Sequence, residues 1–339
     1  MYDLLLSDDE AMIAGSVRDF LEAELPLARL RPDAKLLDAG AVWRGMAGLG
    51  WLGVALPEQA GGSGLGIVEE ALIQRECGRY LVSPGVLATM LAGHVALHAG
   101  DAGLAAAFAA GDAAAALTID AAPAVMDRER DVLAIDRKPD AWLLYWNDDG
   151  MGLFEPSCLW EATEGDPFDD SVTVQSGKLI LDSATFWMAA EREPLPLRAD
   201  VLLAAALVGL ASHACDLAVD YAGLREQFGK PIGSFQAVKH RCADMAVRQR
   251  LAWYQTCLAA LKLQAGADDA QLQVASAKVL AAEAAHENGR AAIQIHGGIG
   301  FQAECDVHWF VKRAVLYDQA GGAMAQQCER IIAAPRPAW

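Results

Sequence analysis

The sequence predicts a mainly α-helical protein with a small β domain in the middle of the chain. Apolar residues recur at helical spacing through the first third of the chain and again from about residue 198 onward. Between these regions, short strand-like runs alternate with clusters of Asp, Gly, Pro and Asn, a pattern typical of strands and turns. We therefore expect an N-terminal helical domain over residues 1–115, a small β domain over 116–194 and a C-terminal helical bundle over 195–339.

The first predicted helix covers residues 8–24. Ser7 and Glu10 have the spacing of a capping box, and an apolar face follows at Met12, Ile13, Val17, Phe20 and Leu21. Four more helical patterns follow at about 37–50, 66–80, 83–99 and 102–110. Gly and Pro residues at 57–66, and the pair Ser83-Pro84, mark the breaks between them.

The middle segment predicts strands at residues 115–119, 142–146, 172–175 and 179–181. Helical spacing then returns for the rest of the chain, near 198–224, 234–263, 269–294, 304–315 and 319–333. The apolar stretch 201–219 is long enough to cross a membrane, but it contains His213 and Asp216. We therefore expect a helix buried inside the bundle.

Composition limits the classes of function. Acidic residues outnumber basic ones 45 to 27, which gives a net charge of −18, so nucleic acid and anionic membranes are not expected partners. The seven cysteines contain no CxxC pair, which indicates reduced thiols in a cytoplasmic protein. The N-terminus has no basic region followed by a long apolar one, so no secretory signal is expected.

Three segments resemble the acyl-CoA dehydrogenase family. They are Gly50-Trp51-Leu52-Gly53 with the loop and helix up to Arg79, the run Arg225-Glu226-Gln227-Phe228-Gly229-Lys230 up to Gln236, and Gln294-Ile295-His296-Gly297-Gly298-Ile299-Gly300-Phe301. They occur in order and at the family's spacing across almost the whole chain. The resemblance implies FAD as cofactor, an acyl-CoA thioester as substrate, and the family fold. That fold has an N-terminal helical domain, a β-barrel-like middle domain and a C-terminal four-helix bundle.

The second and third segments contain residue types suited to a dinucleotide. An arginine fork at a helix end, such as Arg225, is a good receptor for a pyrophosphate dianion. A glycine pair after a helix permits close approach of the main chain to a ligand. The resemblance implies that these motifs grip the adenosine and pyrophosphate of an FAD whose flavin ring lies mainly in a neighbouring subunit. The expected cofactor-binding residues are Arg225, Gln227, Phe228, Gln236, Gln294, Gly297 and Gly298.

Two other patterns carry less weight. The segment 61–66 resembles a phosphate loop, but no predicted strand precedes it and no Lys-Ser/Thr follows it. His94 and His98 have the spacing of a metal-binding pair, yet no third ligand is suggested nearby. We expect core or surface histidines and no metal site.

The reaction implied by the resemblance needs a carboxylate that removes the α-proton while the β-hydrogen leaves as hydride. In most members this base is a glutamate in a Glu-Gly-Thr run after the glycine pair, and that position is Gly321 here. A minority use a glutamate at the start of the helix before the Arg-Phe-Gly motif, and that position is Ala199, next to Asp200. The sequence therefore leaves the catalytic residue unknown.

The middle domain also departs from the family pattern. Residues 132–135 read Val-Leu-Ala-Ile where the family has a Trp-x-Thr-Asn-like strand against the flavin ring. Thr118 matches one position of the other flavin-contacting loop, but Ile-Asp-Ala-Ala at 119–122 replaces the usual Glu-Pro-Gly-rich continuation. We infer that this chain has lost its own pocket for the flavin ring. It keeps the residues that would contact the FAD of a partner subunit.

These departures favour the non-base subunit of an α2β2 acyl-CoA dehydrogenase, completed by a homologous acyl-CoA dehydrogenase subunit. Similar short companion chains belong to heteromeric enzymes of bacterial catabolism, including sterol side-chain types. The resemblance also implies an electron-transfer flavoprotein as electron acceptor. Two alternatives stay open: a self-sufficient homo-oligomeric enzyme with Asp200, Asp318 or Glu304 as base, and a scaffold that binds neither FAD nor thioester.

Overall fold

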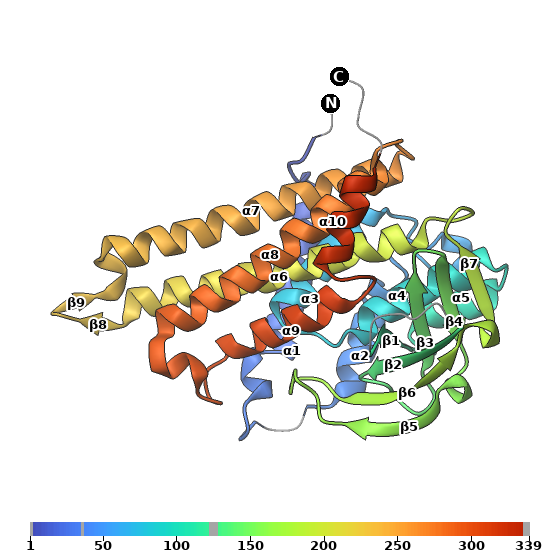
Figure 1. Cartoon of the computed structure of the whole chain (residues 1–339), viewed down its shortest axis with the longest axis horizontal. Coiled ribbons are helices and arrows are strands. Elements are labelled where there is room, and N and C mark those ends of the chain that lie inside the picture. The colour runs from blue at the N-terminus through green and yellow to red at the C-terminus, as the bar shows by residue number, and fades with distance from the viewer. Residues whose placement is uncertain (1–2, 35–36, 122–127, 335–339) are drawn as a thin grey trace.

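The structure is a computed structural model that describes residues 3–34, 37–121 and 128–334. Helices come first, a seven-stranded sheet follows, and long helices complete the chain (Figure 1), which confirms the predicted fold class. Met1 and Tyr2 of the N-terminal segment, and Ala122 of the segment discussed above, lie outside the described residues.

The N-terminal helices begin and end close to the predicted positions. They are α1 (Asp8–Glu24), α2 (Ala39–Gly48), α3 (Ile67–Arg79), α4 (Gly85–His98) and α5 (Ala102–Ala110). The predicted capping box is present, since the Ser7 hydroxyl accepts from the Glu10 N–H at 3.3 Å and the Glu10 carboxylate accepts from the Ser7 N–H at 2.6 Å. Two acceptors thus satisfy backbone N–H groups at the start of α1.

The sheet contains more strands than the sequence predicted. Its strands are β1 (Ala115–Asp120), β2 (Glu129–Ile135), β3 (Trp142–Asn147), β4 (Gly150–Phe154), β5 (Trp160–Gly165), β6 (Val174–Ile180) and β7 (Phe186–Ala189). The order is β5-β6-β2-β1-β3-β4-β7, and β1 pairs with β3 in parallel while the other neighbours are antiparallel.

The two strands predicted at 172–175 and 179–181 are wrong, because β6 is one continuous strand. Gly177 interrupts its apolar pattern, and a side chain there would meet the β5 backbone, with a Cβ 2.8 Å from the Trp160 carbonyl oxygen. The glycine therefore allows close strand packing and does not mark a turn. Strands β4, β5 and β7 were missed, since β4 contains two glycines, β5 is mostly polar and exposed, and β7 is a short edge.

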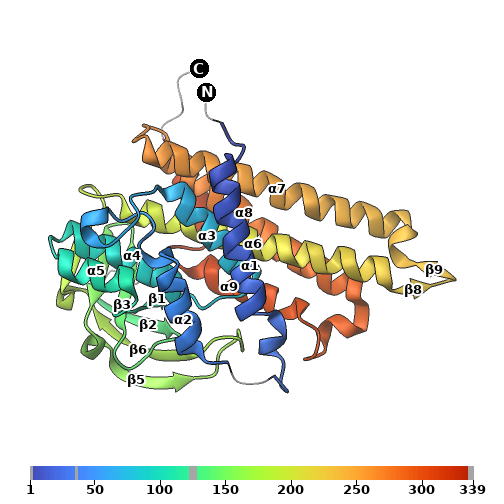
Figure 2. The ribbon, with the colours of Figure 1, turned by 180° about the vertical axis from the view of Figure 1, so that it is seen from behind.

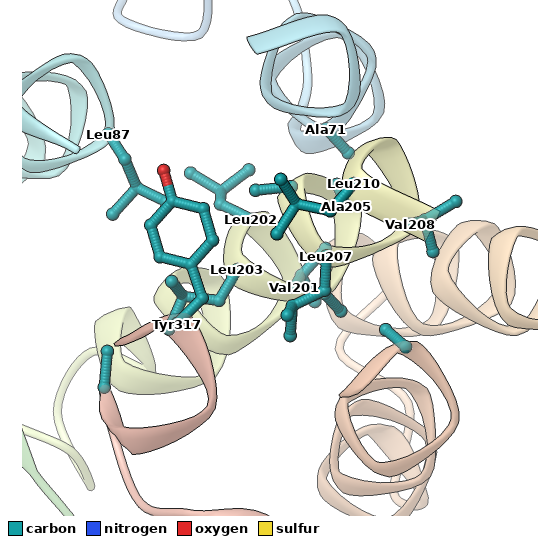
Figure 3. Packing of buried hydrophobic residues seen from close by; sticks show 14 of the residues in the cluster. Ala71, Leu87, Val201, Leu202, Leu203, Ala205, Leu207, Val208, Leu210 and Tyr317 are labelled. Atoms are coloured by element: carbon teal, nitrogen blue, oxygen red, sulfur yellow. The ribbon is translucent and has the colours of Figure 1, made fainter. Parts of the chain in front are cut away.

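The C-terminal helices are α6 (Leu195–Leu224), α7 (Gln236–Gln264), α8 (Ala270–His296), α9 (Val307–Gln319) and α10 (Met324–Ala333). Helix α6 runs through the core, and Leu202, Leu207 and Leu210 pack among side chains of α3, α4 and α9 (Figure 3). Among the described residues it is the one helix long and apolar enough to span a membrane. Because 83% of its apolar window is buried inside the protein, it is a core helix, as predicted.

Candidate functional site

The predicted cofactor residues lie at the end of the bundle where α6 and α8 finish. A small hairpin, β8 (Glu226–Gln227) and β9 (Lys230–Pro231), projects there beyond the long helices (Figures 1 and 2). Tyr221, in the last turn of α6, stacks on His296, the last residue of α8, with ring centroids 4.2 Å apart. This stack brings the helix end that carries Arg225 beside the helix end that carries Gly297.

The hairpin turn exposes a large apolar side chain. Phe228 has φ 53° and Gly229 has φ 77°, the two positive values of a type I′ turn. The Phe228 ring is 92% exposed and meets Phe235 edge-on, while the Lys230 ammonium lies 4.4 Å above the Phe235 ring. A non-glycine residue at positive φ and an apolar ring in water both carry a cost, which points to an interaction surface.

The glycine pair leaves the end of α8 open. Gly297 has φ 63° and ψ −141°, a conformation that only glycine adopts readily. A Cβ added at Gly297 or Gly298 would meet no atom within 4 Å. A ligand can therefore approach the main chain here without displacing any side chain of this protein.

All seven predicted cofactor residues are exposed in this chain: Arg225, Gln227, Phe228, Gln236, Gln294, Gly297 and Gly298. Arg225 caps α6 through its N–H, which donates to the Tyr221 carbonyl at 2.8 Å, and its guanidinium is in solvent. An arginine fork, amide side chains and an open glycine turn fit the adenosine and pyrophosphate half of FAD. They form an open surface and not a closed pocket, so the surface fits a site shared with another chain.

Of the two positions at which the resemblance expects a base, Gly321 lies beside Asp200, the neighbour of the other position, Ala199. Ala199 is fully buried at the start of α6, and its neighbour Asp200 faces Gly321. A Cβ at Gly321 would lie 2.4 Å from the Trp146 indole nitrogen and 2.7 Å from Asp200 Oδ1. Gly321 also has φ 66°, so a glutamate at this position would need both neighbours and the backbone to move.

Asp200 is held in a network of donors. Its Oδ1 accepts from Lys278 Nζ at 2.9 Å, and its Oδ2 accepts from Gln327 Nε2 at 3.2 Å and from Arg330 Nη1 at 3.1 Å. Burial lowers the pKa of Lys278, although the charge of Asp200 opposes this. A buried carboxylate shared by two cations and an amide has no free oxygen for proton abstraction. We therefore assign Asp200 a structural role.

The other two candidate bases lie in different surroundings. Asp318 accepts from the Met324 N–H at 3.0 Å, which caps α10, and its other oxygen is 3.7 Å from His286 Nε2. Glu304 is exposed between the Gly300 turn and α9. Neither residue lines the cavities that adjoin Gly321 and Asp200.

These two cavities have volumes of about 500 and 270 Å³, and Trp146, Gly321 and Arg330 line both. The buried Trp146 N–H has no hydrogen-bond partner within residues 3–34, 37–121 and 128–334. Thr118 lines the smaller cavity, but its hydroxyl donates to the Leu144 carbonyl at 2.7 Å and is committed to the sheet. Sequence reasoning missed Trp146, Lys278 and Arg330. The sequence feature that could have indicated this network is Lys278, a single lysine in the apolar segment 274–285.

The histidine pair is not arranged as a metal site. His94 Nε2 lies 2.7 Å from Glu70 Oε1, and Arg198 pairs with the other oxygen of that buried carboxylate. Burial would raise the pKa of Glu70, but His94 and Arg198 hold it below its usual value. Over residues 3–34, 37–121 and 128–334, no three His, Cys, Asp or Glu side chains cluster as metal ligands. All seven cysteines are free thiols.

Comparison with known proteins supports the family resemblance. The sequence profile described as "Acyl-CoA dehydrogenase, N-terminal domain" matches residues 7–119, and "Acyl-CoA dehydrogenase, C-terminal domain" matches residues 199–334. The acyl-CoA dehydrogenase IpdE2 of Mycobacterium tuberculosis is 34% identical over 278 residues, which are 78% of this chain and 77% of IpdE2. The chain belongs to the acyl-CoA dehydrogenase family. Members of this family use FAD, which accepts the hydride when bound.

Two further comparisons refine this assignment. The acyl-CoA dehydrogenase FadE34 of Mycobacterium tuberculosis is 35% identical over 80% of this chain, but the match spans only 39% of FadE34. A structure described as the ChsE4-ChsE5 complex from Mycobacterium tuberculosis shares the acyl-CoA dehydrogenase fold with a TM-score of 0.79. The similarity covers 99% of this chain and 100% of the chain in that structure, and the sequence identity is 22%.

Proposed function

We propose that this chain is the non-base subunit of an α2β2 FAD-dependent acyl-CoA dehydrogenase. Its bundle end grips the adenosine and pyrophosphate of an FAD, and a homologous partner subunit supplies the flavin-ring pocket and the catalytic glutamate. The partner's carboxylate removes the α-proton of an acyl-CoA thioester. This chain binds and orients the cofactor at the shared site.

One observation carries the proposal: neither family base position has a carboxylate, and Asp200, the acidic neighbour of Ala199, is bound by other side chains beside Gly321. Gly321 has no room for a side chain, Ala199 is buried, and Asp200 is bound by Lys278 and Arg330. General-base catalysis needs a carboxylate within hydrogen-bond reach of the substrate proton. The exposed cofactor residues at the other end of α6 support a site in which this chain binds FAD and a second chain supplies the base.

The comparisons support a two-component assembly. A solved structure that is similar over 99% of this chain is described as a complex of ChsE4 and ChsE5. We further propose that the acyl group is bulky, sterol side chains included, that an electron-transfer flavoprotein reoxidises the flavin, and that the enzyme is cytoplasmic. The net charge of −18 and the buried position of α6 are compatible with a soluble enzyme.

The direct test is to purify the chain alone and together with an adjacently encoded homologue. We expect flavin absorbance and acyl-CoA oxidation only in the mixture, with equal numbers of the two chains in light-scattering measurements. Turnover of an acyl-CoA by the isolated chain would contradict the proposal. A mixture that stays colourless would indicate a cofactor-free scaffold.

Two substitutions in this chain, studied in the same mixture, test whether Arg225 binds the cofactor. Arg225→Gln removes the guanidinium at the bundle end, and Arg44→Gln removes an exposed guanidinium on α2. We expect Arg225→Gln to weaken FAD retention about tenfold, the loss of one hydrogen bond between charged groups, and Arg44→Gln to leave it unchanged. Equal flavin content in both variants would show that Arg225 does not bind the cofactor.

A further inference from the structure

Another cavity, of about 320 Å³, lies between the N-terminal helices and the bundle. Figure 2 shows α1 crossing in front of the long helices in this region. The cavity is lined by Arg18 of α1, by Arg75 and Arg79 of α3, and by Arg250 of α7. The carboxylates in its lining are Glu76 and Asp216, so the lining has an excess of two positive charges in a protein of net charge −18.

The arginines exceed what the lining carboxylates can accept. Arg18 donates to both oxygens of the buried Glu76 at 3.0 Å, and Arg75 donates twice more to Glu76 Oε1 at 3.2 and 3.0 Å. Arg79 Nη2 donates to Asp216 at 2.8 Å. The acceptor sites of Glu76 are thus nearly filled. The second terminal nitrogens of Arg18 and Arg75 lie outside these bonds.

Several donors at the cavity have no acceptor among the residues that the structure describes. Arg79 Nε is buried 3.4 Å from Glu76 Oε2, in a geometry that makes no hydrogen bond. Gln249 uses its oxygen to accept from Ser212 at 2.8 Å, which leaves its amide N–H groups to donate. Arg250 is exposed and pairs with no carboxylate in the part of the chain that the structure describes. Burial lowers the pKa of Arg75 despite the opposing charge of Glu76.

We propose that this cavity binds a phosphate or diphosphate group, either free or carried on a nucleotide. Guanidinium forks match the oxygens of phosphate, and a group with a charge near −2 at neutral pH balances the excess of two positive charges. The site is separate from the cofactor grip, because none of the seven cofactor residues lines it. It is also separate from the cavities around Gly321. The proposal therefore does not depend on the catalytic role of the chain.

Calorimetric titration of the purified full-length protein with inorganic phosphate, pyrophosphate and ADP, at ionic strength matched with KCl, tests the proposal. We expect one saturable pyrophosphate site per chain that persists in Arg225→Gln, the variant in which the cofactor grip is weakened. Tighter binding of ADP than of pyrophosphate would identify a nucleotide as the source of the group, and equal or weaker binding would identify a free anion.

Three variants locate the site. Arg250→Gln, which removes an exposed and unpaired guanidinium, should weaken pyrophosphate binding about tenfold. Arg241→Gln is the matched control, because it makes the same change at an exposed position of α7 outside the cavity, and it should bind like the wild type. Arg225→Gln should also keep the binding.

Three outcomes would overturn the proposal. The first is the absence of saturable binding, which would leave the arginines a purely structural network. The second is equal weakening in Arg250→Gln and Arg241→Gln, which would mean non-specific attraction. The third is loss of binding in Arg225→Gln, which would place the anion at the cofactor grip. Unfolding curves of the variants verify that each one is folded.

Discussion

At the scale of single residues, the pair of Asp200 and Lys278 shows how a buried charge is maintained. The two side chains are 3% and 0% exposed, and Lys278 also donates to the Ala320 carbonyl. Breaking such a pair leaves an uncompensated charge in a medium of low dielectric constant, which costs more than the pair itself contributes. The pair lies beside Gly321, so it also fixes the backbone at the position of the missing base.

Lys278→Met should therefore destabilise the protein by about 3 kcal/mol. Arg330 and Gln327 remain near Asp200 and limit the loss. Equilibrium unfolding in urea measures the effect, and Lys239→Met, at an exposed position of α7, should change stability by less than about 0.5 kcal/mol. A change of under about 1 kcal/mol for Lys278→Met would mean that Arg330 alone neutralises Asp200.

His213 is a half-buried residue whose protonation should affect how stability depends on pH. Its ring stacks on Phe310 with centroids 5.3 Å apart and meets Tyr80 edge-on at 5.5 Å. Burial and the nearby Arg79 lower the pKa of His213 to about 4, against the opposing effect of neighbouring carboxylates. The folded protein thus keeps this ring neutral at a pH where the unfolded chain is protonated.

Stability should accordingly fall as the pH drops from about 6.5 to about 4, because only the unfolded state binds the extra proton in this window. The contribution of His213 amounts to about 3 kcal/mol at most. His213→Phe keeps an aromatic ring and removes the titration, so urea unfolding between these pH values should show a shallower loss. The exposed His240→Phe variant should follow the wild type. Identical pH profiles for wild type and His213→Phe would refute the assignment.

At the scale of elements, α3 and α6 approach each other through two glycines. A Cβ at Gly78 would lie 2.0 Å from the Ala206 carbonyl oxygen, and a Cβ at Gly209 would lie 2.0 Å from the Arg75 carbonyl oxygen. Both glycines are within helices, where glycine has a poor intrinsic propensity. Close packing of the two backbones explains why glycine is present.

Gly78→Ala and Gly209→Ala should each destabilise the protein by about 3 kcal/mol, because the added methyl group forces the helices apart. Gly223→Ala, in the last turn of α6, is the matched control: its Cβ would meet nothing within 4 Å. It should be neutral or stabilising by up to about 1 kcal/mol, as helix propensity predicts. Thermal and urea unfolding compare the three variants, and equal effects at Gly209 and Gly223 would contradict the packing argument.

At the scale of the whole molecule, Arg313 joins the bundle to the other two parts of the chain. Arg313 lies on α9 and is fully buried. It donates to Asp169 at 2.5 Å and to the Ser171 hydroxyl at 2.9 Å, both in the segment between β5 and β6, and to the Val82 carbonyl, between α3 and α4, at 2.7 Å. Burial would lower the pKa of Arg313, but Asp169 raises it above its usual value, so the guanidinium stays charged.

Arg313→Met should destabilise the protein by about 4 kcal/mol, since it leaves Asp169 charged and buried without its partner. We also expect the helical and sheet regions to unfold less cooperatively, which near- and far-ultraviolet circular dichroism can compare. Arg31→Met breaks a partly exposed ion pair with Asp306 at 2.9 Å and should cost less than about 1 kcal/mol. Similar losses in the two variants would show that Arg313 does not join the parts.

Local patterns in the sequence were sufficient for most of the helices. The α1 capping box and the apolar faces depend on residues three or four positions apart, so they were predictable without any knowledge of the fold. Strands β4, β5 and β7 were not, because partners distant in sequence decide whether polar or glycine-containing segments pair. The seven cofactor residues came from ordered motifs, and their role remains a prediction.

The sequence by itself determined the order of the helical and β regions, the family resemblance, and the identity of the residues at the two base positions. Only the tertiary structure decided that Asp200 is bound by Lys278, 78 residues away, and by Arg330, 130 residues away. It also decided that arginines of α1, α3 and α7 line one cavity. The physical reason is that charge interactions and steric exclusion depend on distance in space, whereas sequence patterns report only neighbours along the chain.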